Sequence, residues 1–174
     1  MTGPVLLVCR SATPGAEEAP WHLVFERAAR AVRVVELTAA AADEWPRARR
    51  SVDGASVVLG IGDAADAAYR LASRTPTAFR LIVADARVQP SDTRDGLGVP
   101  EVPITAISSD PPRAAATGAL LGWASRTVGA FEIRTLPPWR VAPDAFVTGC
   151  LRHLHEAGLL SGPDDRGDVL ALRP

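Results

Sequence analysis

Short β-branched segments alternate along the chain with Ala-rich segments of helical length, and this alternation limits the possible folds more than any other feature. The apolar segments lie at 5–9, 32–37, 55–60, 79–84, 102–107 and 131–136. The segments of helical length lie at 19–30, 42–51, 63–74, 113–127 and 143–157. Short, nearly continuous apolar segments are typical of parallel strands that are buried on both faces. The sequence therefore predicts an α/β doubly wound sheet of about six mainly parallel strands, with helices on both faces.

The length of 174 residues fits one domain with a substantial hydrophobic core. We expect a single domain over 1–158 and a mobile C-terminal tail at 159–174, where the periodicity is weak. The segment 87–101 is rich in polar residues, Gly and Pro, so it is expected to form a loop where a helix would otherwise lie.

The ionisable residues exclude several kinds of chemistry. All 19 basic residues are Arg, so no Lys is present to form a Schiff base or to hold nucleotide phosphates, and no cofactor is expected. The net charge of −1 gives no electrostatic reason to expect nucleic acid or an anionic membrane as partner. No apolar run is long enough to cross a bilayer. Cys9 and Cys150 make neither a disulfide framework nor a zinc site, so a cytoplasmic protein is expected.

The turn after the third apolar segment, Gly60-Ile61-Gly62-Asp63-Ala64-Ala65, leads directly into a helical segment and has two interpretations. As a loose G-x-G-x-x-A pattern, with Asp85 as the ribose acceptor, it indicates a Rossmann-like nucleotide binder. Asp63 and Asp66 disfavour this interpretation, because carboxylates in the first helical turn repel a pyrophosphate. As a strand, a Gly-x-nucleophile-x-Ala turn and a helix, it matches the nucleophile elbow of α/β hydrolases, with Gly62 at the nucleophile position.

The order of motifs over 4–158 resembles the type II thioesterases that serve polyketide and nonribosomal peptide synthetases. The matching motifs are the elbow, Pro103-Ile104-Thr105-Ala106, and Trp123…Thr127-x-Gly129-x-Phe131-x-x-Arg134-x-Leu136-Pro137. That family has G-H-S-M-G-A, P-I-T-A and W…T…F…R…L-P-G-G-H at these places, and 6–15 resembles its first core strand and oxyanion loop. The resemblance implies an α/β-hydrolase fold, with the family's helical lid reduced to the loop 87–101.

The chain departs from this family at the residues that carry its chemistry. Gly62 stands in place of the nucleophilic Ser, and Arg140 stands in place of the His, although Arg cannot act as a base at neutral pH. Asp110 alone matches a triad position, that of the acid. Thr13 and Pro14 replace the oxyanion-loop glycines, and Pro14 has no N–H to donate. The resemblance therefore implies a thioesterase-like protein with a degenerate triad.

No other constellation replaces the triad in the sequence. Cys9 is expected to be a buried apolar residue. His153 and His155 are two residues apart on a helix, so they are expected to point in different directions. Cys150 and His153 share a helix face but lack the two further ligands of a metal site, and no metal is expected.

The polar residues that follow the strands remain as ligand-binding candidates. They are Ser11, Asp63, Asp85, Ser109, Asp110, Trp139 and Arg140. Two interpretations of the charged residues stay open. The first is that Asp63, Asp85, Asp110 and Arg140 converge and support acid–base chemistry such as a cyclisation or isomerisation. The second, which we favour, is that Asp63 and Asp66 cap the helix and Arg140 pairs with Asp110.

We therefore expect a pseudoenzyme that binds rather than hydrolyses. Its expected partners are an acyl-carrier protein or a partner enzyme of polyketide or nonribosomal peptide biosynthesis, with a small acyl or polyketide ligand. Loss of the lid is expected to expose apolar surface and to favour a homo- or hetero-oligomer. The alternatives are a non-hydrolytic cyclase or isomerase acting on a polyketide-type substrate and, less favoured, the nucleotide binder.

Overall fold

The computed structural model describes residues 5–10, 24–25, 33–38, 40–42, 44, 56–88, 100–108 and 114–158. The strands are β1 (Val5–Arg10), β2 (Arg33–Thr38), β3 (Ser56–Ile61), β4 (Ala78–Ala84), β5 (Ile104–Ser108) and β6 (Phe131–Thr135). The helical elements are the 3₁₀ turn η1 (Gly62–Ala64), α3 (Ala65–Arg74), α4 (Ala114–Leu121), the 3₁₀ turn η3 (Gly122–Arg126) and α5 (Pro143–Glu156). Residues 24–25, 40–42 and 44 are also helical.

The strands form one six-stranded sheet in the order β2-β1-β3-β4-β5-β6, and every neighbouring pair is parallel. The chain passes from β1 outward to β2 and returns to β3 on the opposite side of β1. The strand order therefore reverses between β1 and β3, and ligands of such sheets bind beyond the carboxyl ends of the strands at this reversal. The predicted sheet of six parallel strands is confirmed.

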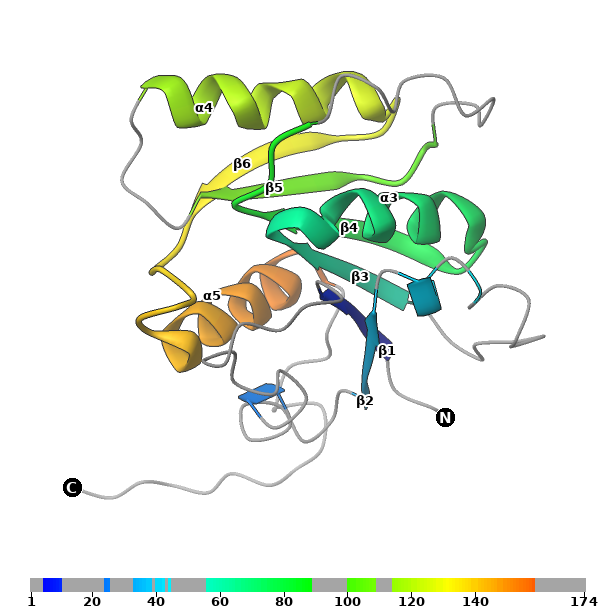
Figure 1. Ribbon diagram of the computed structural model, residues 1–174, viewed down its shortest axis with the longest axis horizontal. Coiled ribbons are helices and arrows are strands. Elements are labelled where there is room, and N and C mark those ends of the chain that lie inside the picture. The colour runs from blue at the N-terminus through cyan, green and yellow to red at the C-terminus, as the bar shows by residue number, and fades with distance from the viewer. Residues whose placement is uncertain are drawn as a thin grey trace.

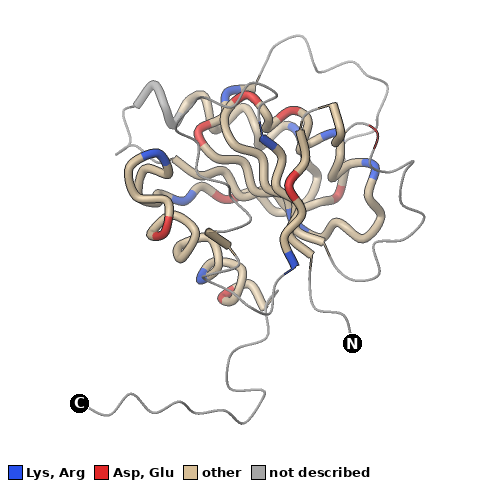
Figure 2. The backbone as a smooth tube through the Cα atoms, turned by 60° about the horizontal axis from the view of Figure 1, so that its bottom comes forward, with Lys and Arg blue, Asp and Glu red and all other residues tan. Residues whose placement is uncertain are grey.

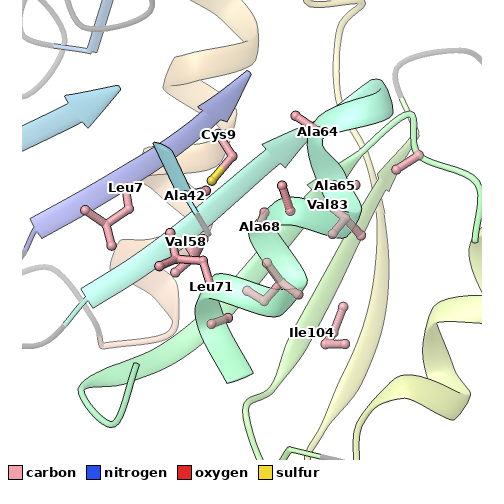
Figure 3. Close-up of a cluster of buried hydrophobic side chains, with 14 of the residues drawn as sticks. Leu7, Cys9, Ala42, Val58, Ala64, Ala65, Ala68, Leu71, Val83 and Ile104 are labelled. Atoms are coloured by element: carbon pink, nitrogen blue, oxygen red, sulfur yellow. The ribbon is translucent and has the colours of Figure 1, made fainter. Parts of the chain in front are cut away.

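Helices cover both faces of the sheet, as predicted. Figure 1 shows α3 and α4 over one face and α5 over the other. All six residues of β3 are buried, because this central strand is covered on both sides. The α3 face is packed with small and branched side chains, among them Leu7 and Val58 of the sheet with Ala68 and Leu71 of α3 (Figure 3). The α3 face also holds Trp123, and the α5 face holds Phe25 and Phe146, so both faces bury aromatic side chains.

The close packing of α3 on β3 depends on Gly60. A Cβ atom at Gly60 would lie 2.6 Å from the Cβ atom of Ala68 and 2.7 Å from the Cα atom of Ala65. No side chain fits in that space, so the helix reaches the strand only because residue 60 is Gly and its neighbours are Ala.

Several sequence predictions concern residues outside the described ranges. They are most of the helices expected at 19–30 and 42–51, the centre of the loop 87–101 and the tail 159–174. The reduction of the lid to that loop therefore stays a prediction. None of the described helices is long and apolar enough to cross a membrane.

Candidate functional site

A sharp turn joins β3 to the helix that follows, at the reversal of strand order. Gly62, the first residue after β3, has a φ of +56°, in the left-handed region that favours Gly. Ile61 before the turn and Ala64 after it are buried. The predicted strand, sharp turn and helix are therefore present, in an arrangement that a nucleophile elbow also has, and the assignment of Gly62 to its nucleophile position stays a prediction. A Cβ atom at Gly62 would meet nothing within 4 Å among the described residues, so the tip of the elbow has no side chain and no close neighbour in that part of the chain.

Trp139 and Arg140 lie in the loop after β6, at the same edge of the sheet as the elbow. Trp139 is 8% exposed and belongs to the buried cluster that includes Ile61 and Phe146. Arg140 is exposed, and its guanidinium carbon lies 4.7 Å from the centre of the Trp139 ring. This cation–π contact fixes the exposed guanidinium of Arg140 against the buried ring of Trp139. The arrangement is suited to binding an anion.

Asp63 and Asp85 are also exposed at this edge. Asp85 follows β4 with a φ of +50°, a left-handed conformation that residues other than Gly seldom adopt. Its backbone N–H donates to the carbonyl oxygen of Ile107 at 2.9 Å, which ties this turn to β5.

The predicted capping of the helix by Asp63 and Asp66 is wrong. The N-cap residues are Ile61 for η1 and Ala64 for α3, and neither makes a side-chain capping bond. Both carboxylates instead lie in a first turn, where the helix dipole favours negative charge. Asp66 also accepts a 2.8 Å hydrogen bond from the buried guanidinium of Arg126. This full positive charge interacts with Asp66 more strongly than the helix dipole does.

Some of the predicted site residues lie outside the described ranges. They are Ser11, Thr13, Pro14, Ser109 and Asp110. The loss of the oxyanion loop and the pairing of Arg140 with Asp110 therefore stay predictions.

The two cysteines are free and buried. Figure 3 shows Cys9 among the small side chains on the α3 side of the sheet, which confirms its predicted burial. Burial raises the pKa of the Cys150 thiol, so this thiol is unreactive. His153 is buried and His155 is exposed, so the two His point in different directions, as predicted.

A partly buried polar cluster that the sequence did not reveal joins the sheet to α5. Thr105 Oγ1 lies 3.0 Å from His153 Nε2 and 2.9 Å from Glu132 Oε1. Arg80 Nη1 donates to Glu132 Oε1 at 2.7 Å and to Thr105 Oγ1 at 2.8 Å. The visible signal is a polar residue within each of three neighbouring strands, at Arg80, Thr105 and Glu132, but only the register places these residues together.

The cluster keeps His153 neutral and Glu132 ionised. Burial lowers the pKa of His153, and the Arg134 and Arg80 charges lower it further against the opposing effect of Glu132. Burial works to raise the pKa of Glu132, but the Thr105 hydrogen bond and the nearby positive charges outweigh it and lower that pKa. His153 therefore serves the cluster as a hydrogen-bonding group, 3.0 Å from Glu132 Oε1.

Acidic and basic residues are interspersed over the described part of the chain, as Figure 2 shows. The edge that carries the elbow has both signs, with Asp63 and Asp85 beside Arg87 and Arg140 exposed there.

The chain is similar in structure to thioesterases and esterases. It superposes on the thioesterase RedJ from the prodiginine biosynthetic pathway of Streptomyces coelicolor with a TM-score of 0.60 and 17% identity, covering 88% of each chain. It superposes on the Vlm2 thioesterase domain with a TM-score of 0.64 and 11% identity, covering 91% of this chain and 94% of that one. The esterase domain of a Rhodothermus marinus protein gives a TM-score of 0.61 and 9% identity, over 91% of this chain and 86% of that one. No protein-family model and no curated protein sequence matches the chain.

Proposed function

The chain has the α/β-hydrolase fold of thioesterases, and from this premise we propose that it binds acyl-carrier-bound intermediates without hydrolysing them. The observation that carries the proposal is Gly62 at the tip of the elbow. With no side chain there, no atom of the elbow can attack an acyl carbonyl, and no covalent acyl intermediate forms at this position. Binding of a carrier-bound acyl group needs no nucleophile.

Arg140 supports a role in binding. A guanidinium cannot accept a proton at neutral pH, so this residue does not replace a general base. Its planar donors are suited to a phosphate group, and the Trp139 ring 4.7 Å away restricts its freedom. The phosphopantetheine arm that carries acyl groups contains such a phosphate. We assign Arg140 to this group.

The structural neighbours favour a biosynthetic setting. One of them, RedJ, is named as a thioesterase of prodiginine biosynthesis, and another, Vlm2, is a thioesterase domain. We infer that this chain acts beside an acyl-carrier protein or a partner enzyme of a polyketide or nonribosomal peptide pathway, as a pseudoenzyme.

The test combines intact-mass and binding measurements. The chain is incubated with an acylated carrier protein, and we expect no release of the acyl group above the buffer rate. Calorimetric titration with the same carrier is expected to show binding that Arg140→Ala weakens by about tenfold. Arg152→Ala is the matched control, because Arg152 is an exposed Arg on α5, away from the elbow. Release of the acyl group that depends on Arg140, or absence of binding, would overturn the proposal.

A second candidate function rests on the strained conformation of Asp85. Backbone strain held at a strand end is common in sites that position a group for chemistry. Asp85 with Arg140 would then serve a cyclisation or isomerisation, in which a carboxylate moves a proton. Conversion of a substrate into a product of the same mass would favour this candidate over binding alone, provided that Asp85→Asn abolishes the conversion.

A further inference from the structure

Strand β6 is an edge of the sheet, and its outward backbone groups have no strand partner among the described residues. In the described part of the chain it pairs with β5 alone, and its last three residues are exposed. The Ala130 carbonyl oxygen and the Leu136 N–H bond to the β5 side. Since backbone groups of a strand alternate in direction, residues 131, 133 and 135 present theirs outward. This parity places Ile133 at the middle of the free edge.

We propose that β6 pairs antiparallel with β6 of a second copy of this chain, about a two-fold axis at Ile133. Ile133 then lies opposite Ile133 of the second copy, and the two residues exchange both of their outward N–H···O=C bonds. Phe131 lies opposite Thr135 in the same register, so all three outward residues are paired. The result is a continuous twelve-stranded sheet, since each copy contributes six strands.

The charges on β6 favour this register. A two-fold axis at Ile133 places Glu132 of each copy opposite Arg134 of the other, which gives two equivalent pairs. These are non-hydrogen-bonded pairs, at which the side chains of antiparallel strands approach most closely. A parallel in-register pairing would instead oppose Glu132 to Glu132 and Arg134 to Arg134. Because Glu132 and Arg134 have opposite charges and lie on either side of Ile133, they favour antiparallel over parallel pairing of β6.

Glu132 is already held in position for this contact. Its Oε1 atom is fixed by Arg80, Thr105 and His153, whereas its Oε2 atom has a single described contact, to Arg134 at 3.5 Å. Its side chain is 35% exposed. The second copy's guanidinium adds a partner to a carboxylate that loses little freedom on binding.

Exposed apolar side chains gather in the same part of the chain. The large apolar residues that are exposed in the described part are Leu121, Val128, Ile133 and Val141. The first three lie between α4 and the middle of β6. One strand pair buries less than the roughly 1,200 Å² of a stable interface, so the exposed side chain of Ile133 on this edge, and apolar side chains near it, must add to the buried area.

Disulfide trapping tests the register. In the proposed dimer the two Ile133 Cα atoms lie about 5.5 Å apart, a separation that a disulfide spans. We expect Ile133→Cys to form a cross-linked dimer on mild oxidation, read on a non-reducing gel, since the native Cys9 and Cys150 are buried. Thr135→Cys is the control on the same edge, because its copies would lie about 14 Å apart. Ala145→Cys, exposed on α5, is the control away from the edge.

Sedimentation of the full chain tests the dimer itself. Ile133→Pro removes the outward N–H and leaves the bonds to β5 intact, so we expect dimerisation to weaken by about tenfold or more, with an unchanged circular dichroism spectrum. A monomeric native chain, a dimer unaffected by Ile133→Pro, or equal cross-linking of Ile133→Cys and Thr135→Cys would overturn the proposal. None of these outcomes bears on carrier binding, because the elbow lies at the ends of the strands.

Discussion

Arg126 is a buried cation that lies near two aromatic rings and one carboxylate. Its guanidinium lies 5.2 Å from the Tyr69 ring centre and 5.0 Å from that of Trp123, and its side chain is 5% exposed. Asp66 on α3 is its described ion-pair partner, at 2.8 Å. The pair fastens α3 to the segment that follows α4.

Asp66→Ala is therefore expected to destabilise the protein by about 3 kcal/mol, because it removes the 2.8 Å ion pair of a guanidinium that is 5% exposed. Urea unfolding measures this change. The double variant Asp66→Ala with Arg126→Met is expected to recover part of the loss, since it removes the buried charge itself and keeps an apolar side chain against Trp123. A double variant less stable than Asp66→Ala alone would contradict this account.

Substitutions of Asp85 can separate the cost of its left-handed backbone conformation from the role of its carboxylate. Its φ of +50° costs an L-residue about 1–2 kcal/mol relative to Gly. We expect Asp85→Gly to raise the thermal midpoint or leave it unchanged, while removing any ligand response that the carboxylate provides. Asp85→Asn is the matched variant, because Asn tolerates the left-handed conformation and lacks the charge. Clear destabilisation by Asp85→Gly would show that the carboxylate has a structural role.

The sequence predicts the residues of the elbow edge but not the polar cluster, because the cluster depends on the register of the strands. Gly62 follows β3 directly and Arg140 lies five residues after the end of β6, so strand prediction alone places both near the carboxyl edge. Arg80, Thr105 and Glu132 lie within strands, and their meeting depends on the register of β4, β5 and β6. Helical spacing indicated that His153 and His155 diverge, but not which of them faces the sheet.

At the scale of elements, the contact of α3 with β3 positions the elbow. We expect Gly60→Ala to destabilise the protein by about 1–3 kcal/mol, because its Cβ atom would lie 2.6 Å from the Cβ atom of Ala68. Gly118→Ala is the matched control. Gly118 is exposed in α4 with nothing within 4 Å of the added Cβ atom, so this change is expected to stabilise by about 0.5–1 kcal/mol. Equal effects of the two substitutions on urea unfolding would contradict the packing argument.

Within the described residues, the strands and the helical segments at 63–74 and 143–157 lie close to their predicted bounds. Each apolar segment forms a strand, and the signal is strongest for β1, β3 and β5, whose burial on both faces leaves a nearly continuous apolar run. The segment 113–127 was predicted as one helix, yet α4 ends at Leu121 and η3 continues to Arg126. Gly118 and Gly122 lower helix propensity there, and a Cβ atom at Gly122 would lie 3.1 Å from Val88. Tertiary packing of this kind is not visible in the periodicity of one segment.

At the scale of the whole molecule, the polar cluster makes stability depend on pH. The folded chain lowers the pKa of His153, so the unfolded chain binds the proton more readily below its ordinary value of about 6.5. Stability is therefore expected to fall as pH decreases below that value. It falls again below about 4.3, where the unfolded carboxyl of Glu132 takes up a proton before the folded one.

Chemical denaturation at a series of pH values measures this dependence. His153→Gln is expected to lower stability at neutral pH and to flatten the decline between pH values of about 7 and 5. His155→Gln, on the exposed side of α5, is the control and is expected to leave the curve unchanged. A decline that persists in full with His153→Gln would show that other groups cause it.

The order of the strands also has a consequence for the path of folding. Strands β3, β4, β5 and β6 are neighbours both in space and in sequence, so they can assemble one after another. The pairing of β1 with β3 must close a long loop that contains β2, which delays it entropically. We expect pulsed hydrogen exchange to show protection of β4 and β5 before β1 and β2. The elbow lies beside that late junction, so refolding chains would acquire their capacity to bind only in the final step.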